Sequence, residues 1–192
     1  MTQICMVRHG QTDWNLFGRL QGQTDIPLNE TGERQAQECR EFLKDHEWDV
    51  VVTTSLMRAR KTAEIINEGL DLNIVEMDQF KERCFGEGEG MLREDRDRQY
   101  PDFIFPKMES YEDLVARVQN GLNEIHKQFR DQRVLVVAHG AVINTILREF
   151  HNDALGEERV KLWNGCLTDL HLVHNTWVVR SYNQVGHLSE HA

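Results

Sequence analysis

Two histidines in this chain stand directly after short apolar runs of sequence. Arg8 and His9 follow the run 4–7, and His139 follows the run 134–138, each with a glycine directly after the histidine. Apolar runs of about four to eight residues bounded by glycine are typical of buried strands. In α/β proteins, ligand chemistry lies just beyond the carboxyl ends of the strands. Two neighbouring strands of this kind would therefore bring both imidazoles to one crevice.

An arginine and a glutamate elsewhere in the chain could complete a site for phosphate chemistry. Arg58 is expected in the first turn of a helix that follows a strand over 48–52, near free backbone N–H groups that attract anions. The guanidinium groups of Arg8 and Arg58 match the oxygen atoms of a phosphate. An imidazole between them can act as a nucleophile and split phosphoester hydrolysis into two in-line steps. Glu82 can protonate the leaving oxygen as an acid and then, as a carboxylate, activate the attacking water.

Simpler and rival interpretations exist for each of these residues. Taken singly, a histidine after a strand is more often structural, and Arg58 and Glu82 suit a solvated surface. The chain has no H-E-x-x-H motif, and we expect no metal site. The glycine-rich run 86–90 is not followed by G-K-[ST], so it does not predict a Walker loop. A cysteine phosphatase needs an arginine six residues after its cysteine, a place that Gly90 occupies after Cys84.

The elements that must position these residues alternate between strands and helices. Apolar residues at helical spacing predict helices, and continuous or alternating apolar runs predict strands. We expect strands over 4–7, 48–52, 72–75 and 134–138, and a terminal hairpin over 167–173 and 176–182. We expect helices over 29–43, 59–70, 110–129 and 141–150, a short helix near 92–99, and loops over 11–28 and the rest of 76–109. Asn29 and Ser110 are predicted N-caps, and residues 53–55 offer further caps. This order predicts a three-layer α/β/α sandwich with a mostly parallel central sheet, formed by residues 1–192 as a single domain.

Composition narrows the class of protein further. The 192 residues fit one domain, and a hydrophobic fraction of 40% suffices for a sizeable core. A formal net charge of −10 argues against nucleic-acid and membrane-surface partners, which are bound by basic patches. The four cysteines contain no C-x-x-C pair and predict neither a zinc site nor a disulfide framework. Because no signal peptide precedes Ile4 and no apolar run approaches the roughly 18 residues of a membrane helix, we expect a cytoplasmic protein.

Five sequence blocks follow one another along the chain. R-H-G-Q-T-D-W-N stands at residues 8–15, and R-x-Q-G-x-x-D-x-P-L stands at 19–28. S-x-x-R-A-x-x-T-A stands at 55–63, E-R-x-x-G-x-x-E-G at 82–90, and A-H-G at 138–140. In this order the blocks closely resemble the signatures of the histidine phosphatase superfamily, also called the phosphoglycerate mutase-like family. The chain is most similar to its short bacterial-type phosphatases.

The resemblance implies a role for eight residues. His9 would be the phosphorylated nucleophile, and Glu82 would donate and accept the proton. Gln21 and Gly22 would border the phosphate and the leaving group. The phosphoryl group would be held by Arg8, Arg58, His139 and Asn15. The resemblance also implies hydrolysis without a metal or a dissociable cofactor, and a small-molecule phosphate ester as the substrate.

Three functions remain open at this point, and the oligomeric state is open as well. A phosphomonoesterase acting on small phosphorylated metabolites is our interpretation, with a phosphoglycerate mutase or an inactive phosphate-binding regulatory module as alternatives. The mutases that the chain resembles carry an insertion between Glu82 and His139, an interval of only 139 − 82 = 57 residues here.

The family usually has a different, polar residue at the position of Cys84, and the cysteine would alter substrate fit if it lined the pocket. Residues that select the leaving group are expected in three stretches, 21–24, 83–98 and 157–165.

Overall fold

A six-stranded sheet runs through the centre of the protein. The computed structural model describes residues 1–151 and 160–189. The strands are β1 (Gln3–Arg8), β2 (Val50–Thr53), β3 (Ile74–Glu76), β4 (Arg133–Ala138), β5 (Leu167–Val173) and β6 (Thr176–Gln184). They lie in the order β3-β2-β4-β1-β5-β6. The first four are mutually parallel, whereas the β5–β6 hairpin adds two antiparallel strands at one edge. The prediction of a mostly parallel sheet is confirmed, although β2 and β3 begin two residues later than expected.

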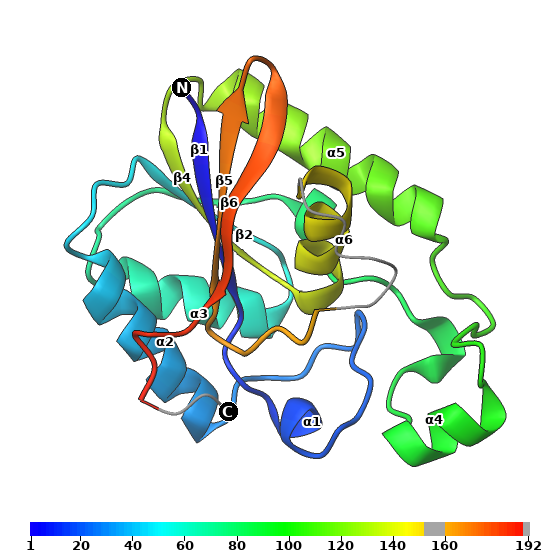
Figure 1. Ribbon diagram of the computed structural model, residues 1–192. Coiled ribbons are helices and arrows are strands. Elements are labelled where there is room, and N and C mark those ends of the chain that lie inside the picture. The colour runs from blue at the N-terminus through cyan, green and yellow to red at the C-terminus, as the bar shows by residue number, and fades with distance from the viewer. Residues whose placement is uncertain (152–159, 190–192) are drawn as a thin grey trace.

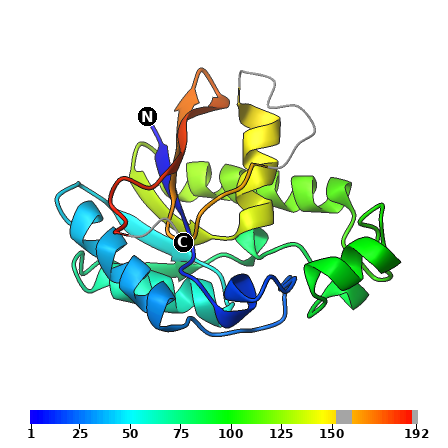
Figure 2. The same cartoon turned by 60° about the horizontal axis from the view of Figure 1, so that its bottom comes forward.

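Helices cover both faces of this sheet. Helices α2 (Glu30–Leu43) and α3 (Met57–Asn67) lie on one side, and α5 (Tyr111–Gln128) and α6 (Gly140–Phe150) lie on the other (Figures 1 and 2). Successive side chains of a strand point to opposite faces. Ile4 and Met6 accordingly join the core beneath α5 and α6, and Cys5 and Val7 join the core beneath α2 and α3. Burial of both faces explains why the strand is a continuous apolar run.

The predicted helix starts are correct in two cases and wrong in one. The side chain of Asn29 accepts a hydrogen bond from the Gly32 amide, and that of Ser110 accepts one from the Asp113 amide. Helix α3 instead begins after Leu56 without a side-chain cap. Residues 53–55 therefore do not cap it, and Thr54 is buried below the site described next.

The long connections contain structure that the hydrophobic period did not reveal. The predicted loop 11–28 holds the one-turn helix α1 (Asp13–Leu16). The segment 76–109 holds the 3₁₀ turns η1 (Asp78–Phe80) and η2 (Gly86–Gly88) and the predicted short helix α4 (Arg93–Gln99). Phe103 lies edge-on to Phe85 and to Phe105, so aromatic contacts rather than a helical stripe hold this segment. Helices α1 and α4 lie beyond the end of the sheet where β1 ends (Figure 1). No helix among the described residues is long and apolar enough to cross a membrane.

Candidate active site

The two histidines meet where β1 and β4 end. These strands are parallel neighbours, with Arg8 paired to Ala138, and the His9 amide donates to the Ala138 carbonyl at 3.0 Å. The ring centroids of His9 and His139 are 5.3 Å apart. Both side chains are buried, with 2% and 0% exposed. The fold thus brings together two imidazoles that are 130 residues apart in sequence (139 − 9).

The hydrogen bond of His9 to the backbone fixes which ring nitrogen can react. Its Nδ1 lies 2.7 Å from the carbonyl oxygen of Gly10, and because a carbonyl only accepts, Nδ1 must carry the hydrogen. The lone pair of the neutral ring is therefore on Nε2. Burial, with the positive charges of Arg58 and Arg8, holds the pKa of His9 well below its ordinary value. The imidazole is consequently neutral and nucleophilic at pH 7.

Two arginines flank this imidazole with donors still free. The guanidinium of Arg58 is fully buried and donates to the carbonyl oxygens of Gly22 at 2.6 Å and Thr24 at 3.0 Å. That of Arg8 donates to the carbonyl of Leu162. The Nε atoms of both arginines are buried and have no partner among the described residues. Buried donors normally find acceptors, so these two suit the oxygens of a bound anion.

His139 is fully buried beside His9 and contacts Thr54. Its Nε2 is 2.9 Å from the Thr54 hydroxyl, and its Nδ1 is buried without a partner in the described part of the chain. Burial lowers the pKa of His139 well below its ordinary value, and Arg58 and His9 lower it further. His139 also precedes helix α6 as its N-cap residue, so the positive end of the helix dipole faces the same space.

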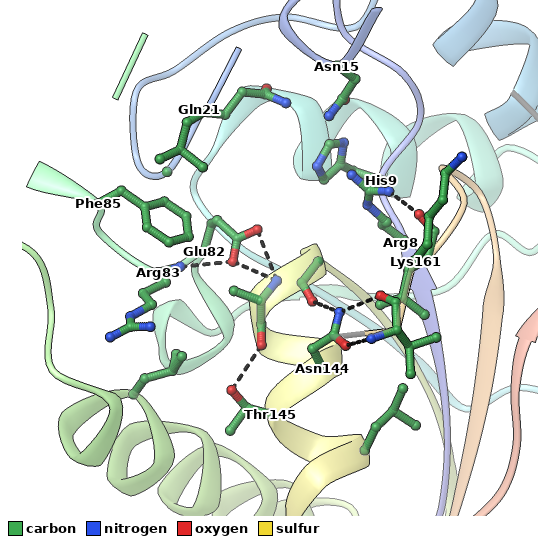
Figure 3. Close-up of a pocket in the computed structure, with 18 of the residues that line it drawn as sticks. Arg8, His9, Asn15, Gln21, Glu82, Arg83, Phe85, Asn144, Thr145 and Lys161 are labelled. Carbon is green, nitrogen blue, oxygen red and sulfur yellow. Dashed lines mark hydrogen bonds between the residues drawn. The ribbon is translucent and has the colours of Figure 1, made fainter. Parts of the chain in front are cut away.

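Glu82 faces this group from the opposite wall. Its carboxylate accepts hydrogen bonds from the Ala141 amide, at 3.1 and 3.2 Å, and from the Arg83 amide at 2.9 Å (Figure 3). Only 9% of the residue is exposed. Ala141 lies in the first turn of α6, so the start of this helix orients the carboxyl group toward the pocket.

The segment that carries Glu82 is held by Arg117, a residue that our sequence analysis missed. The Arg117 guanidinium, on α5, donates to the carbonyls of Gln79, Lys81 and Glu82 at 2.8, 2.6 and 3.1 Å. It also forms a two-pronged ion pair with the carboxylate of Glu109. One side chain thus fixes three carbonyls of an irregular segment and gives Glu82 a defined position.

Glu89 connects this segment to the loop near Gly22. Its carboxylate accepts from the amides of Gln23, Thr24 and Phe85 at 3.0, 2.9 and 3.0 Å. Gly22 has a φ of +57°, and a Cβ placed there would lie 2.0 Å from an oxygen of Glu89. The left-handed backbone therefore favours glycine at position 22, and any larger side chain there would have to displace the Glu89 carboxylate.

Asn15 and Gln21 lie at the rim. The Asn15 side-chain oxygen accepts from Asn164, which also donates to the His9 carbonyl at 2.9 Å. The amide nitrogen of Asn15 lies on the side of His9 in Figure 3. The Gln21 side-chain oxygen accepts from the Thr12 hydroxyl at 2.9 Å.

Seven of the eight predicted site residues line one pocket of about 470 Å³, and the eighth, His139, is buried directly behind His9. The predicted selecting stretches contribute these lining residues: Gln21, Gly22, Arg83, Phe85, Val160, Lys161 and Leu162. Residues 157–159 of those stretches lie outside the described residues. Cys84 is not among the lining residues, and its thiol faces the Lys107 carbonyl instead. Our sequence analysis did not predict that Tyr111, Leu114 and several residues of α6 would form the wall of the pocket.

The fold and the site define an α/β protein with an anion-binding site built around a buried, neutral histidine. Residues 4–185 match the family model of the histidine phosphatase superfamily (branch 1), and the chain belongs to this superfamily. It is a phosphatase, a hydrolase of phosphate monoesters. Its resemblance to the family, inferred from the sequence blocks, is confirmed.

Named relatives of this chain include phosphatases and a mutase. It is 49% identical over 189 residues to the uncharacterized phosphatase PhoE of Bacillus subtilis (strain 168), covering 98% of both chains. It is 34% identical to the metal-independent phosphoserine phosphatase of Arabidopsis thaliana, covering 98% of this chain and 84% of that protein. It is 30% identical to the probable phosphoglycerate mutase GpmB of Proteus mirabilis (strain HI4320), covering 99% and 96%. Among solved structures, Bacillus stearothermophilus YhfR superposes with a TM-score of 0.88 at 25% identity, covering 97% and 99%.

Proposed function

We propose that this protein hydrolyses small phosphate monoesters through a phosphohistidine formed on His9, acting as a single domain in the cytoplasm. The observation that carries the proposal is the His9 imidazole, held by Gly10 with Nε2 as its free nitrogen, between two arginines with unpartnered Nε donors. A neutral imidazole is a competent nucleophile, and two arginines stabilise the negative charge on the phosphoryl group in the transition state of its transfer. The cysteines of the described chain are free thiols, which suits a reducing compartment.

The first half of the reaction transfers the phosphoryl group to the protein. The Nε2 lone pair of His9 attacks phosphorus, and the bond from phosphorus to the ester oxygen breaks. Glu82, protonated, gives its proton to that oxygen, so the alcohol leaves neutral. The phosphoryl oxygens are held by Arg8, Arg58, His139 and Asn15, while Gln21 and Gly22 border the leaving group.

The second half returns the enzyme to its starting state. Glu82, now a carboxylate, takes a proton from a water molecule while the water oxygen attacks the phosphorus. The bond from His9 Nε2 to phosphorus breaks, and inorganic phosphate leaves. The balance closes, because the proton that Glu82 gave to the alcohol is replaced by one from water.

A phosphoglycerate mutase would run the same first step and return the phosphoryl group to its substrate. The short interval after Glu82 does not distinguish the two functions, because the probable mutase of Proteus mirabilis aligns over 207 residues, 96% of its length. The 49% identical relative named a phosphatase favours hydrolysis.

We expect inorganic phosphate to appear from simple monoesters without any bisphosphoglycerate primer. Water can reach the phosphohistidine in the second step, and Glu82 is placed to activate it. The measurement compares phosphate release with interconversion of 3-phosphoglycerate and 2-phosphoglycerate in the same sample. Isomerisation that outruns phosphate release and is stimulated by the primer would establish the mutase instead.

We expect activity to survive treatment with EDTA. The positive charge that a metal ion would bring to the phosphoryl group is assigned here to Arg8 and Arg58, and the Arabidopsis relative is named as metal-independent. Vanadate and inorganic phosphate should inhibit competitively by binding the same residues. Loss of activity with EDTA and its return with one divalent ion would contradict the assignment.

A further inference from the structure

The pocket continues well beyond the residues that we assign to the phosphoryl group. Its wall follows α6 from Gly140 to Arg148, and Tyr111 and Leu114 of α5 face this stretch. A helix rises 1.5 Å per residue, so the backbones of Gly140 and Arg148 are about 12 Å apart. A leaving group whose phosphate lies at His9 therefore has room to extend along α6 toward Arg148.

The basic residues of this pocket share one property. Six arginines and lysines line it, and among the described residues none of the six forms an ion pair with a carboxylate: Arg8, Arg19, Arg58, Arg83, Arg148 and Lys161. In the described part of the chain, at least eleven other basic residues do form such pairs. The chain has 32 acidic and only 22 basic residues, so partners are plentiful elsewhere. Among the described residues, Glu82 carries the only carboxylate that lines the pocket.

A phosphoryl group accounts for only part of this positive charge. Arg8 and Arg58 lie beside His9 and are assigned to that group. Arg19 donates to the carbonyl of Gly90, and Arg83 donates twice to the carbonyl of Glu109, so both are partly engaged by backbone.

Arg148 is the basic residue at the far end of the pocket. Its guanidinium carbon lies 4.8 Å from the centre of the Tyr111 ring. Stacking on a ring leaves the N–H donors at the edge of the guanidinium free for a planar anion. The Tyr111 hydroxyl is 3.1 Å from the Glu149 carboxylate, which fixes the ring on which Arg148 stacks. Lys161 is not on α6 but in the segment 160–164 that leads to β5, and its amine lies 4.4 Å from the centre of the Trp163 ring in the same segment.

We propose that the leaving group of the natural substrate carries a second negative charge, a carboxylate or a phosphate, which Arg148 binds at the end of the pocket remote from His9. This proposal rests on the proposed phosphatase mechanism, because it places the ester phosphate at His9. Between Gly140 and Arg148 the pocket residues of α6 and those facing them at Leu114 and Val160 carry no charge, with Leu147 beside the polar Asn144 and Thr145, so the part of the substrate that joins the two anions is expected to be uncharged. The positive field of the unpaired basic residues also draws a doubly anionic ester into an otherwise acidic protein.

The test uses three phosphate esters of one medium-length alkanol that differ only at the far end. One ends in a carboxylate, one in a phosphonate and one in a neutral carboxamide. We expect the better of the two anionic esters to show a KM about fivefold below that of the carboxamide at similar kcat, the scale of one partly exposed ion pair. The comparison between carboxylate and phosphonate identifies which anion the site prefers.

Variants of single basic residues then locate the anion. Arg148→Gln should bring the KM ratio of amide to anionic ester close to one, and Arg148→Glu should favour an ammonium-ended ester. Arg180→Gln is the matched control, because Arg180 is exposed on β6, has no ion pair with any described residue and is not one of the residues that line the pocket. Lys161→Gln tests whether the anion instead binds Lys161, another basic residue that lines the pocket; we expect this variant to keep the KM ratio of the wild type.

Each outcome decides the proposal. A wild-type ratio near one, a ratio that survives Arg148→Gln, or a ratio lost only with Lys161→Gln would overturn it. Failure of the phosphatase mechanism is recognised separately, because the wild type would then release no nitrophenolate from nitrophenyl phosphate and form no phosphohistidine.

Discussion

A His9→Ala variant is expected to lose turnover by about 10⁴-fold or more, the scale of loss when a covalent nucleophile is removed. Without the imidazole no protein atom is assigned to attack phosphorus. Water would then have to attack the ester directly, in one step and without a positioned nucleophile. The wild type, quenched shortly after mixing with phosphorus-labelled ester, should carry about one label per chain. That label should be stable in alkali and lost in acid, as phosphoramidates are. The alanine variant should carry none.

Two controls distinguish this loss of activity from unfolding of the variant and from the effect of removing any histidine. His9→Ala leaves Arg8 and Arg58 in place, so vanadate should still raise the melting temperature of the variant by binding. His46→Ala changes an exposed histidine outside the active-site pocket and should keep both activity and label. Label that persists on His9→Ala would move the nucleophile to another residue, with His139 the first to test.

The parts of the site that depend on strand ends were predictable from sequence. A strand buried on both faces is a continuous apolar run, and the residues just past it stand at the edge of the sheet whatever the rest of the chain does. His9 and His139 meet because their strands are adjacent and parallel, and Arg58 joins them from the first turn of α3. These placements need only local pattern and the order of the strands.

Contacts across irregular chain were not predictable in the same way. Arg117 reads as one more charged residue on an amphipathic helix, yet it holds three carbonyls of the segment that carries Glu82. Residues 76–109 have no periodic pattern of apolar residues that would show where those carbonyls lie. Edge-on contacts between aromatic rings and backbone hydrogen bonds hold that segment instead. Glu89 did have a signal, since it belongs to the block E-R-x-x-G-x-x-E-G, but its function as a connection to Gln23 and Thr24 appears only in three dimensions.

Thr54 shows how a correct residue type can suggest the wrong function. Threonine after a strand and before a helix is a common N-cap, and residues 53–55 were predicted to cap α3. Helix α3 begins only after Leu56, two residues beyond Thr54, and the Thr54 hydroxyl lies 2.9 Å from Nε2 of His139. The side chain that was expected to cap the start of a helix instead contacts Nε2 of a buried histidine and leaves Nδ1 of that histidine for a ligand.

Glu82→Gln is expected to lower kcat by about 10²–10⁴-fold with esters of ordinary alcohols, the contribution of a positioned general acid. The amide oxygen of glutamine can still accept from the Ala141 and Arg83 amides, so the side chain should keep its place at the start of α6. KM should change little, because the arginines that hold the phosphoryl group are untouched.

The identity of the leaving group tests this assignment most sharply. Nitrophenolate leaves without a proton, so the first step with nitrophenyl phosphate should be almost as fast in Glu82→Gln as in the wild type. The second step still needs a base to activate water, and the variant has none at this position. Rapid mixing should therefore show a burst of about one nitrophenolate per chain, followed by slow release of phosphate, with labelled phosphohistidine accumulating. Glu87→Gln, an exposed carboxylate of the same segment, is the matched control and should behave as the wild type. If the variant lost activity equally with nitrophenyl and alkyl esters and showed no burst, Glu82 could not be the residue that exchanges the proton.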